Sequence, residues 1–85
     1  MIVDYAFTAI SKKRFKKLPK EVQARIISKM DYFLHSGIPL AFADSLKDHK
    51  LGDYRFRVGD YRVIFDVEDD MIVIQDVGHR REIYR

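Results

Sequence analysis

The chain has 85 residues, a formal net charge of +3 and no cysteine. This length fits a single small domain spanning residues 1–85, and the lack of cysteine excludes disulfides, thiolate metal sites and thiol nucleophiles. The mildly basic charge permits a nucleic acid partner. Because no apolar run approaches the ~20 residues of a membrane span, we expect a cytoplasmic protein without a membrane segment.

A short strand opens the predicted fold. Residues 2–7 alternate as a strand does, and the apolar positions that share one face are Val3, Tyr5 and Phe7. Thr8 follows and can cap a helix, because its hydroxyl can accept a backbone N–H of the first helical turn.

The helix expected after this strand has a basic outer face. Lys12, Lys13 and Lys16 fall on that face and are candidate contacts to an RNA backbone. The alternative is an ordinary solvated helix face, for which a run of lysines is equally typical.

A second helix is expected between Pro19, which suits its first position, and Gly37, which can end it. Apolar residues recur at helical spacing along this stretch and predict one buried stripe, formed by Val22, Ile26, Ile27, Met30, Phe33 and Leu34. The two helices then form a hairpin.

The connector at residues 38–50 shows little periodicity. The three histidines of the chain, His35, His49 and His79, lack the spacing of metal ligands. We therefore expect neither a metal site nor a cofactor.

Residues 51–67 predict two strands joined by a two-residue turn. Gly59 at the first central position suits a type II′ turn, which sets Arg57 opposite Arg62. Because side chains alternate between faces, one face is apolar and carries Tyr54, Phe56, Val58, Tyr61, Val63, Phe65 and Val67. The other face carries Arg55, Arg57 and Arg62. Like charges facing each other are unfavourable, so this face suggests an anion site; the alternative is a solvated face covered by arginine stems.

A last strand is expected from Met71 onward, after a turn of two aspartates. With Glu68 opposite Met71, Gln75 and Val77 fall on the arginine face, and Val77 lies beside Arg62.

The predicted order is therefore β-α-α-β-β-β. This is an α+β fold in which a helix hairpin covers one face of a small, mostly antiparallel sheet. The other face carries the arginines, and a short basic tail with His79, Arg80 and Tyr84 reaches them from one end.

Two stretches carry a resemblance to a known family. The first is residues 54–65, which contain the sequence Arg-Val-Gly-Asp-Tyr-Arg at positions 57–62. The second is residues 77–85, which end in Glu-Ile-Tyr-Arg. Together with the helix hairpin, they resemble toxins of the RelE/ParE superfamily over the whole chain. This implies the RelE-like toxin fold. The RelE branch cleaves mRNA in the ribosomal A site, whereas the ParE branch is understood to act on DNA gyrase.

The resemblance also implies a set of site residues. In the RelE branch, basic residues on the sheet neutralise the scissile phosphate, and a C-terminal tyrosine completes the site. The matching catalytic residues here are Arg55, Arg62, Arg80 and Tyr84. Two further positions, Arg57 and His79, would bind RNA. The chain departs from the family at Asp53, where another basic residue is common.

This reaction needs no metal, because the 2′-hydroxyl of the RNA attacks the adjacent phosphorus. Forked guanidinium groups meet the charge requirement. Tyr84 is the favoured proton acceptor, because a terminal tyrosine recurs in the family. The other candidate is His79, because imidazole ordinarily titrates near neutrality.

The resemblance implies partners as well. They are the ribosome with its mRNA, and a cognate RelB-like antitoxin, encoded adjacently, in a toxin–antitoxin hetero-oligomer. The alternative function is a non-enzymatic inhibitor of DNA gyrase of the ParE type. The arginine cluster and Tyr84 favour an mRNA endonuclease, whereas the Arg-Val-Gly-Asp-Tyr-Arg stretch occurs in both branches. A generic RNA-binding module is disfavoured, because the aromatic side chains are expected on the buried face.

Overall fold

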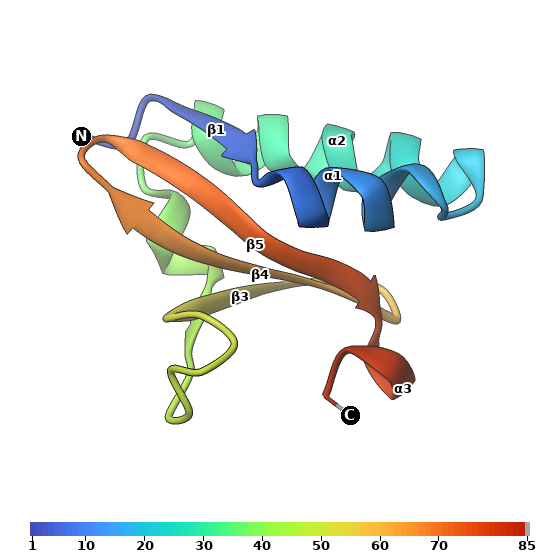
Figure 1. Ribbon diagram of the computed structural model, residues 1–85. Coiled ribbons are helices and arrows are strands. Elements are labelled where there is room, and N and C mark those ends of the chain that lie inside the picture. The colour runs from blue at the N-terminus through green and yellow to red at the C-terminus, as the bar shows by residue number, and fades with distance from the viewer. Residues whose placement is uncertain (85) are drawn as a thin grey trace.

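The computed structural model describes residues 1–84, which fold as helices on a five-stranded sheet (Figure 1). In chain order the elements are β1 (Asp4–Phe7), α1 (Ala9–Lys16), α2 (Lys20–His35), the 3-10 helix η1 (Pro39–Phe42), β2 (Asp44–Ser45), β3 (Tyr54–Val58), β4 (Tyr61–Glu68), β5 (Met71–His79) and α3 (Arg80–Ile83). The strand order is β1-β5-β4-β3-β2, with β1 parallel to β5 and the other pairs antiparallel. The α+β prediction is confirmed.

The two layers leave one side of the sheet without long helices. The α1 and α2 helices lie over one face, whereas α3 and the loop that precedes β3 project from the other face (Figure 1). No helix within residues 1–84 is long and apolar enough to cross a membrane.

The helix boundaries follow the predicted signals. The Thr8 hydroxyl accepts the Ser11 N–H at 3.1 Å and caps α1. The fully buried Ser11 hydroxyl in turn donates to the Ile74 carbonyl at 2.7 Å and ties α1 to β5. The α2 helix begins at Lys20, so Pro19 is its N-cap, one residue before the predicted first position, and Gly37, with φ of +79°, follows its last turn.

The core lies between α2 and the sheet. Its helical side consists of the buried residues Val22, Ile26, Met30 and Phe33. The Phe33 ring stacks on Phe56 with centroids 4.4 Å apart, and Phe56 stacks on Phe65 at 4.5 Å. Burying each such side chain contributes about 1.5–3 kcal/mol, so this packing decides which sheet face turns away from water.

The central hairpin has the predicted register. Val58 pairs with Tyr61, Arg57 with Arg62 and Arg55 with Ile64. Gly59 has φ of +61°, the left-handed value that a type II′ turn requires at its first central position.

The predicted position of Val77 is wrong because of a β-bulge. Ile74 pairs with Phe65 but Asp76 pairs with Ile64, so Gln75 is an extra residue in β5. The bulge shifts the rest of the strand by one residue. Val77 therefore lies on the core face, where it is 2% exposed, and Gly78 rather than Val77 pairs with Arg62.

The set of strands differs from the prediction at two further places. Val3 lies outside β1 and is 65% exposed, because pairing with β5 begins only at Asp4. The sequence also missed β2, which pairs with β3 through Asp44 and Arg55. A two-residue strand is too short to show alternation in a sequence.

Gly52 provides a test of the packing on the open face of the sheet, which is the face that α1 and α2 do not cover. A Cβ at Gly52 would lie 2.7 Å from the Cγ2 of Ile64, which is fully buried. We expect Gly52→Ala to lower the free energy of unfolding by about 1–3 kcal/mol through overpacking, to which the φ of +156° at Gly52 adds backbone strain. Gly78→Ala is the matched control, because its nearest neighbour would be 3.9 Å away. Urea unfolding measures both, and equal stability of the two variants would contradict the packing described.

Candidate active site

The open face of the sheet carries the arginines that the sequence predicted there. Arg55 and Arg57 come from β3 and Arg62 from β4. Between them the face has an apolar base, formed by Ile64 from β4 and Ile83 from α3, both buried. The loop before β3 and the α3 helix project on either side of this face (Figure 1).

Asp44 lies among these arginines, although no sequence pattern predicted it there. Its Oδ2 is 3.0 Å from the Nε of Arg55 and 3.2 Å from the Nε of Arg57. The hydrogen bond from Arg55, followed by the charges of Arg57 and Arg62, lowers the pKa of Asp44. One carboxylate oxygen thus accepts a hydrogen bond from Arg55 and forms an ion pair with Arg57, so two guanidinium groups converge on one anionic oxygen. The β2 strand supplies Asp44, so only its pairing with β3 could have revealed the residue.

Tyr84 reaches the same arginine cluster from the C-terminal side. Its hydroxyl accepts a hydrogen bond from Nη1 of Arg55 at 2.9 Å. The hydrogen bonds with Tyr84 and then with Asp44 raise the pKa of Arg55 above its ordinary value. Ile83, 4% exposed, anchors the helical turn that carries Tyr84. The tail therefore folds back to the arginine cluster as predicted, and its hydrogen bond goes to Arg55.

Arg62 and Arg80 meet at the turn between β3 and β4. Nη1 of Arg62 donates to the carbonyls of Gly59 and Tyr61, each at 2.9 Å. Arg80 donates its backbone N–H to the Asp60 carbonyl at 2.8 Å, and its Nε lies 3.7 Å from the Asp60 carboxylate. The turn thus holds the second pair of predicted arginines at one end of the open face.

His79 has a local structural contact. It is the N-cap of α3, and its Nδ1 accepts the Arg81 N–H at 3.1 Å. Its ring meets the ring of Tyr61 edge to face, with centroids 5.3 Å apart. Since Nδ1 accepts a hydrogen bond, the neutral ring carries its proton on Nε2. His79 therefore orients the turn that leads to Tyr84.

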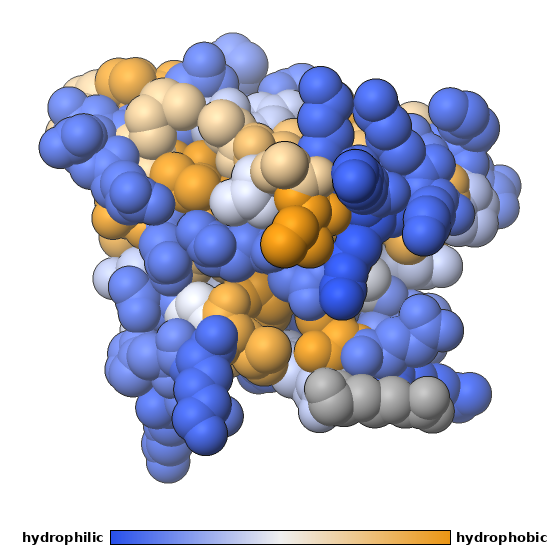
Figure 2. Space-filling view, viewed as in Figure 1, coloured by the Kyte–Doolittle hydropathy of each residue, from blue (hydrophilic) through white to orange (hydrophobic). Residues whose placement is uncertain are grey.

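The predicted lysines lie on the other side of the molecule. Lys12, Lys13 and Lys16 are exposed on α1, which covers the sheet face opposite the arginines. Figure 2 shows hydrophilic side chains gathered over α1. The structure brings Arg55, Arg57, Arg62, Arg80 and Tyr84 to one side, but it does not bring the lysines to them. Within residues 1–84, no three histidine or acidic side chains gather as metal ligands.

Known proteins are similar to this chain in sequence and in fold. Residues 5–84 match the family model described as "ParE toxin of type II toxin-antitoxin system, parDE". Toxin RelG of Mycobacterium tuberculosis (strain ATCC 25618 / H37Rv) is 30% identical over 81 residues, which cover 93% of this chain and 92% of RelG. This chain belongs to the RelE/ParE superfamily of type II toxins.

Solved toxin–antitoxin complexes from three organisms contain chains that are similar to the toxin. The toxin–antitoxin complex RelBE2 of Mycobacterium tuberculosis contains a chain with 26% identity and a TM-score of 0.78, covering 94% of the toxin and 100% of that chain. The RelB–RelE complex of Methanococcus jannaschii contains a chain with 29% identity and a TM-score of 0.67. The match covers 92% of the toxin and 93% of that chain. The archaeal RelE–RelB complex of Pyrococcus horikoshii OT3 contains a chain with 29% identity and a TM-score of 0.70. The match covers 96% of the toxin and 99% of that chain.

The Asp44 contacts predict a pH dependence of stability. Because the folded state lowers the pKa of Asp44 below its ordinary 3.8, this carboxylate stabilises the fold above that pH. The contribution is lost as the pH falls through the lower folded value. We therefore expect Asp44→Asn to be less stable than the parent toxin at pH 7, with a difference that shrinks in acid below pH 3.8. Urea unfolding at several pH values measures this, and a difference that stays constant into acid would contradict the ion pairs.

Proposed function

We propose that the toxin inhibits translation as a ribosome-dependent mRNA endonuclease, acting in the cytoplasm without a metal or cofactor. The observation that carries this proposal is the anion-holding arginine cluster on the open sheet face, with the Tyr84 hydroxyl hydrogen-bonded to Arg55. Cleavage of a phosphodiester requires positive charge that stabilises the reacting phosphate, which the arginines supply. It also requires a group that transfers protons, and the tyrosine hydroxyl is ionisable.

The names of the relatives leave two branches to consider. The family model is named for ParE, whereas the curated relative and the solved structures carry Rel names. The ParE-like alternative is a non-enzymatic inhibitor of DNA gyrase, which would need no converging proton-transfer group. The contact between Arg55 and Tyr84 supports the endonuclease.

The arginines would stabilise charge on the reacting phosphate. We propose that the scissile phosphate takes the position of the Asp44 carboxylate on Arg55 and Arg57. Arg62 and Arg80, from the adjacent turn, would approach the phosphate from the other end of the face. Donors fixed before the substrate binds need little reorganisation as negative charge develops, which is the main source of electrostatic catalysis.

Two proton transfers accompany the cleavage. The 2′-oxygen loses its proton as it bonds to phosphorus, and the 5′-oxygen gains a proton as its bond to phosphorus breaks. The products are a 2′,3′-cyclic phosphate and a 5′-hydroxyl. We assign the first transfer to Tyr84, because its hydroxyl is the ionisable group that is hydrogen-bonded to the arginine cluster. His79 is the alternative, with a hydrogen bond from Arg81 on one ring nitrogen.

The binding partners follow from the same proposal. Arg57, with a 61% exposed side chain, is available to the RNA backbone beside the reacting phosphate. The α1 lysines would contact more distant RNA of the ribosome. We further propose that an adjacently encoded, RelB-like antitoxin holds the toxin in a hetero-oligomer, as in the similar complexes.

Mapping the 5′ ends of cellular mRNA after induction of the toxin tests the proposal directly. We expect new ends within translated codons, and we expect Arg62→Ala to abolish them because it removes a guanidinium from the open face. Lys29→Ala is the charge-matched control, since Lys29 is an exposed residue of α2, which covers the opposite face of the sheet. Intact mRNA together with stalled gyrase complexes would support the ParE-like alternative instead.

Substitution of the tyrosine tests the proton assignment. Tyr84→Phe keeps the ring and removes the hydroxyl, so single-turnover cleavage on ribosomes should fall by ~10²–10⁴-fold. Ribosome binding should change little, because the arginines remain. A larger loss in His79→Gln would transfer the role to His79. Unchanged cleavage in both variants would leave the arginines acting by charge alone and refute the assignment.

A further inference from the structure

The loop between β2 and β3 carries a histidine–carboxylate pair to which the proposed cleavage assigns no role. Nδ1 of His49 lies 2.8 Å from Oδ1 of Asp53, and the side chains of both residues are exposed by half or more. Because a carboxylate only accepts hydrogen bonds, Nδ1 donates to Asp53, which leaves Nε2 free of this contact. An exposed pair of this kind contributes little to stability, so stability alone does not explain it.

This loop is packed onto the open face of the sheet. A Cβ at Gly52 would lie only 2.7 Å from Cγ2 of Ile64, whose side chain forms the base of that face. The N–H of Asp53 donates to the Asp66 carboxylate of β4 at 2.7 Å, and its carbonyl accepts the N–H of Leu46 at 2.9 Å. The backbone of Asp53 is therefore fixed at the place where β3 begins.

Asp53 brings the imidazole close to the arginine cluster. Asp53 precedes Arg55 by two residues, and Arg55 precedes Arg57 by two. Side chains at this spacing along a strand share one face and lie ~6–7 Å apart. His49, held by Asp53, is therefore within reach of a phosphate bound to Arg55.

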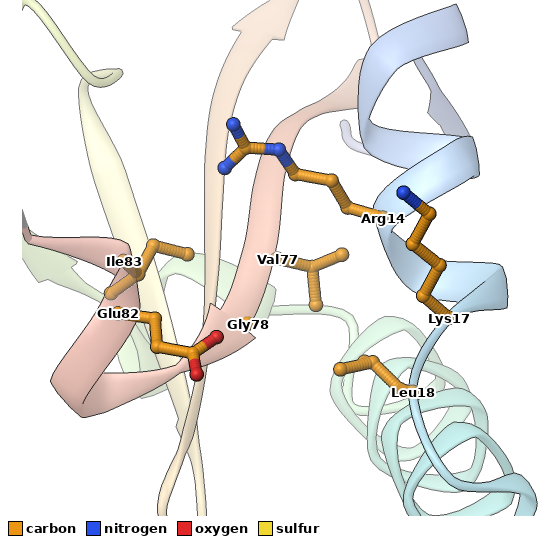
Figure 3. A pocket seen from close by; sticks show the side chains of 7 residues that line it. All are labelled: Arg14, Lys17, Leu18, Val77, Gly78, Glu82 and Ile83. Carbon is orange, nitrogen blue, oxygen red and sulfur yellow. The ribbon is translucent and has the colours of Figure 1, made fainter.

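The histidine and the catalytic tyrosine lie on opposite sides of the open face. The loop that carries His49 projects on one side and α3 on the other (Figure 1). Ile83 of α3 lies beside Gly78 at the end of β5 (Figure 3), and the next residue, Tyr84, accepts a hydrogen bond from Arg55. A phosphate on Arg55 would therefore lie between the two ionisable side chains.

We propose that His49 is the general acid of the cleavage and that Asp53 positions its ring. The attacking and leaving oxygens lie in line across the phosphorus, so the base and the acid must act from opposite sides. As the bond from the 2′-oxygen to phosphorus forms, Tyr84 takes the proton of that oxygen. As the bond from phosphorus to the 5′-oxygen breaks, its electron pair stays on the 5′-oxygen, which takes the proton from Nε2 of His49.

After this step the imidazole is neutral and still donates Nδ1–H to Asp53, and proton exchange with water restores His49 and Tyr84. This inference rests on the proposed endonuclease function and assigns its second proton transfer.

The other basic groups of the site suit this transfer less well. A guanidinium has an ordinary pKa above ~12, whereas imidazole ordinarily titrates near neutrality, where proton transfer is most effective. The imidazole of His79 belongs to the N-cap of α3. It therefore lies on the same side of the open face as Tyr84, whereas the acid must face the base across the phosphorus.

A sulfur-substituted mRNA separates this role from any other role of the loop. The probe is an mRNA in which sulfur replaces the 5′-oxygen at the bond that the parent toxin cuts. A thiol is far more acidic than an alcohol, so the sulfur leaves as a thiolate and needs no proton. In single-turnover cleavage on ribosomes, we expect His49→Gln to slow the oxygen substrate by ~10²–10⁴-fold but to cleave the sulfur substrate within ~3-fold of the parent rate.

Three further variants provide the controls. His35→Gln makes the same substitution at an exposed histidine of α2, which covers the other face of the sheet, and should cleave both substrates at the parent rate. Tyr84→Phe should be slow on both, because the 2′-oxygen must still lose its proton. Asp53→Asn should lose ~10-fold or more on the oxygen substrate alone, because an amide no longer fixes which ring nitrogen of His49 carries the proton.

Two results would overturn the inference. One is cleavage of the oxygen substrate by His49→Gln at the parent rate. The other is an equal loss on the oxygen and sulfur substrates, which would make the loop a binding or structural element. Either result leaves the endonuclease proposal intact, because the parent toxin still cuts the mRNA. A parent toxin that leaves ribosome-bound mRNA uncut overturns the endonuclease proposal and this inference with it.

Discussion

The arginines share one face of the sheet because the other face is buried beneath α2. Side chains alternate along a strand, so burying Phe56 and Val63 leaves Arg55, Arg57 and Arg62 on the open side. Each buried apolar side chain contributes about 1.5–3 kcal/mol, whereas the unfavourable pairing of Arg57 with Arg62 costs only ~0.2–1 kcal/mol. The core therefore holds together a cluster of like charges that would otherwise separate.

Asp44 and Tyr84 stabilise this cluster of positive charges and orient its guanidinium groups. The carboxylate of Asp44 accepts a hydrogen bond from Nε of Arg55 and forms an ion pair with Arg57, and the Tyr84 hydroxyl accepts a hydrogen bond from Nη1 of Arg55. Guanidinium groups fixed in this way face the open side already oriented. An incoming phosphate would compete with a single carboxylate for them, and phosphate offers more oxygens to forked donors. Under the proposed function, the internal ion pairs describe the site before an RNA phosphate binds.

The sequence predicted the parts of the site that local rules determine. The glycine turn and strand alternation were enough to set Arg57 opposite Arg62 and to expose the arginines. The position of Val77 failed because nothing in the residues around Gln75 marks a bulge. Asp44 was missed because two residues cannot show a strand pattern, and the partner of Tyr84 depends on how α3 packs through Ile83, which is a tertiary effect.

The central claim is that an RNA phosphate replaces the Asp44 carboxylate on Arg55 and Arg57. The most direct measurement is an NMR titration of ¹⁵N-labelled toxin with a short RNA whose 2′-hydroxyls are methylated, so that it binds but is not cut. We predict that the arginine Nε–H signals of Arg55 and Arg57 shift together, and that Asp44→Asn saturates at lower RNA concentration because the internal competitor is gone. Shifts confined to α1, with both arginine signals unchanged, would contradict the account.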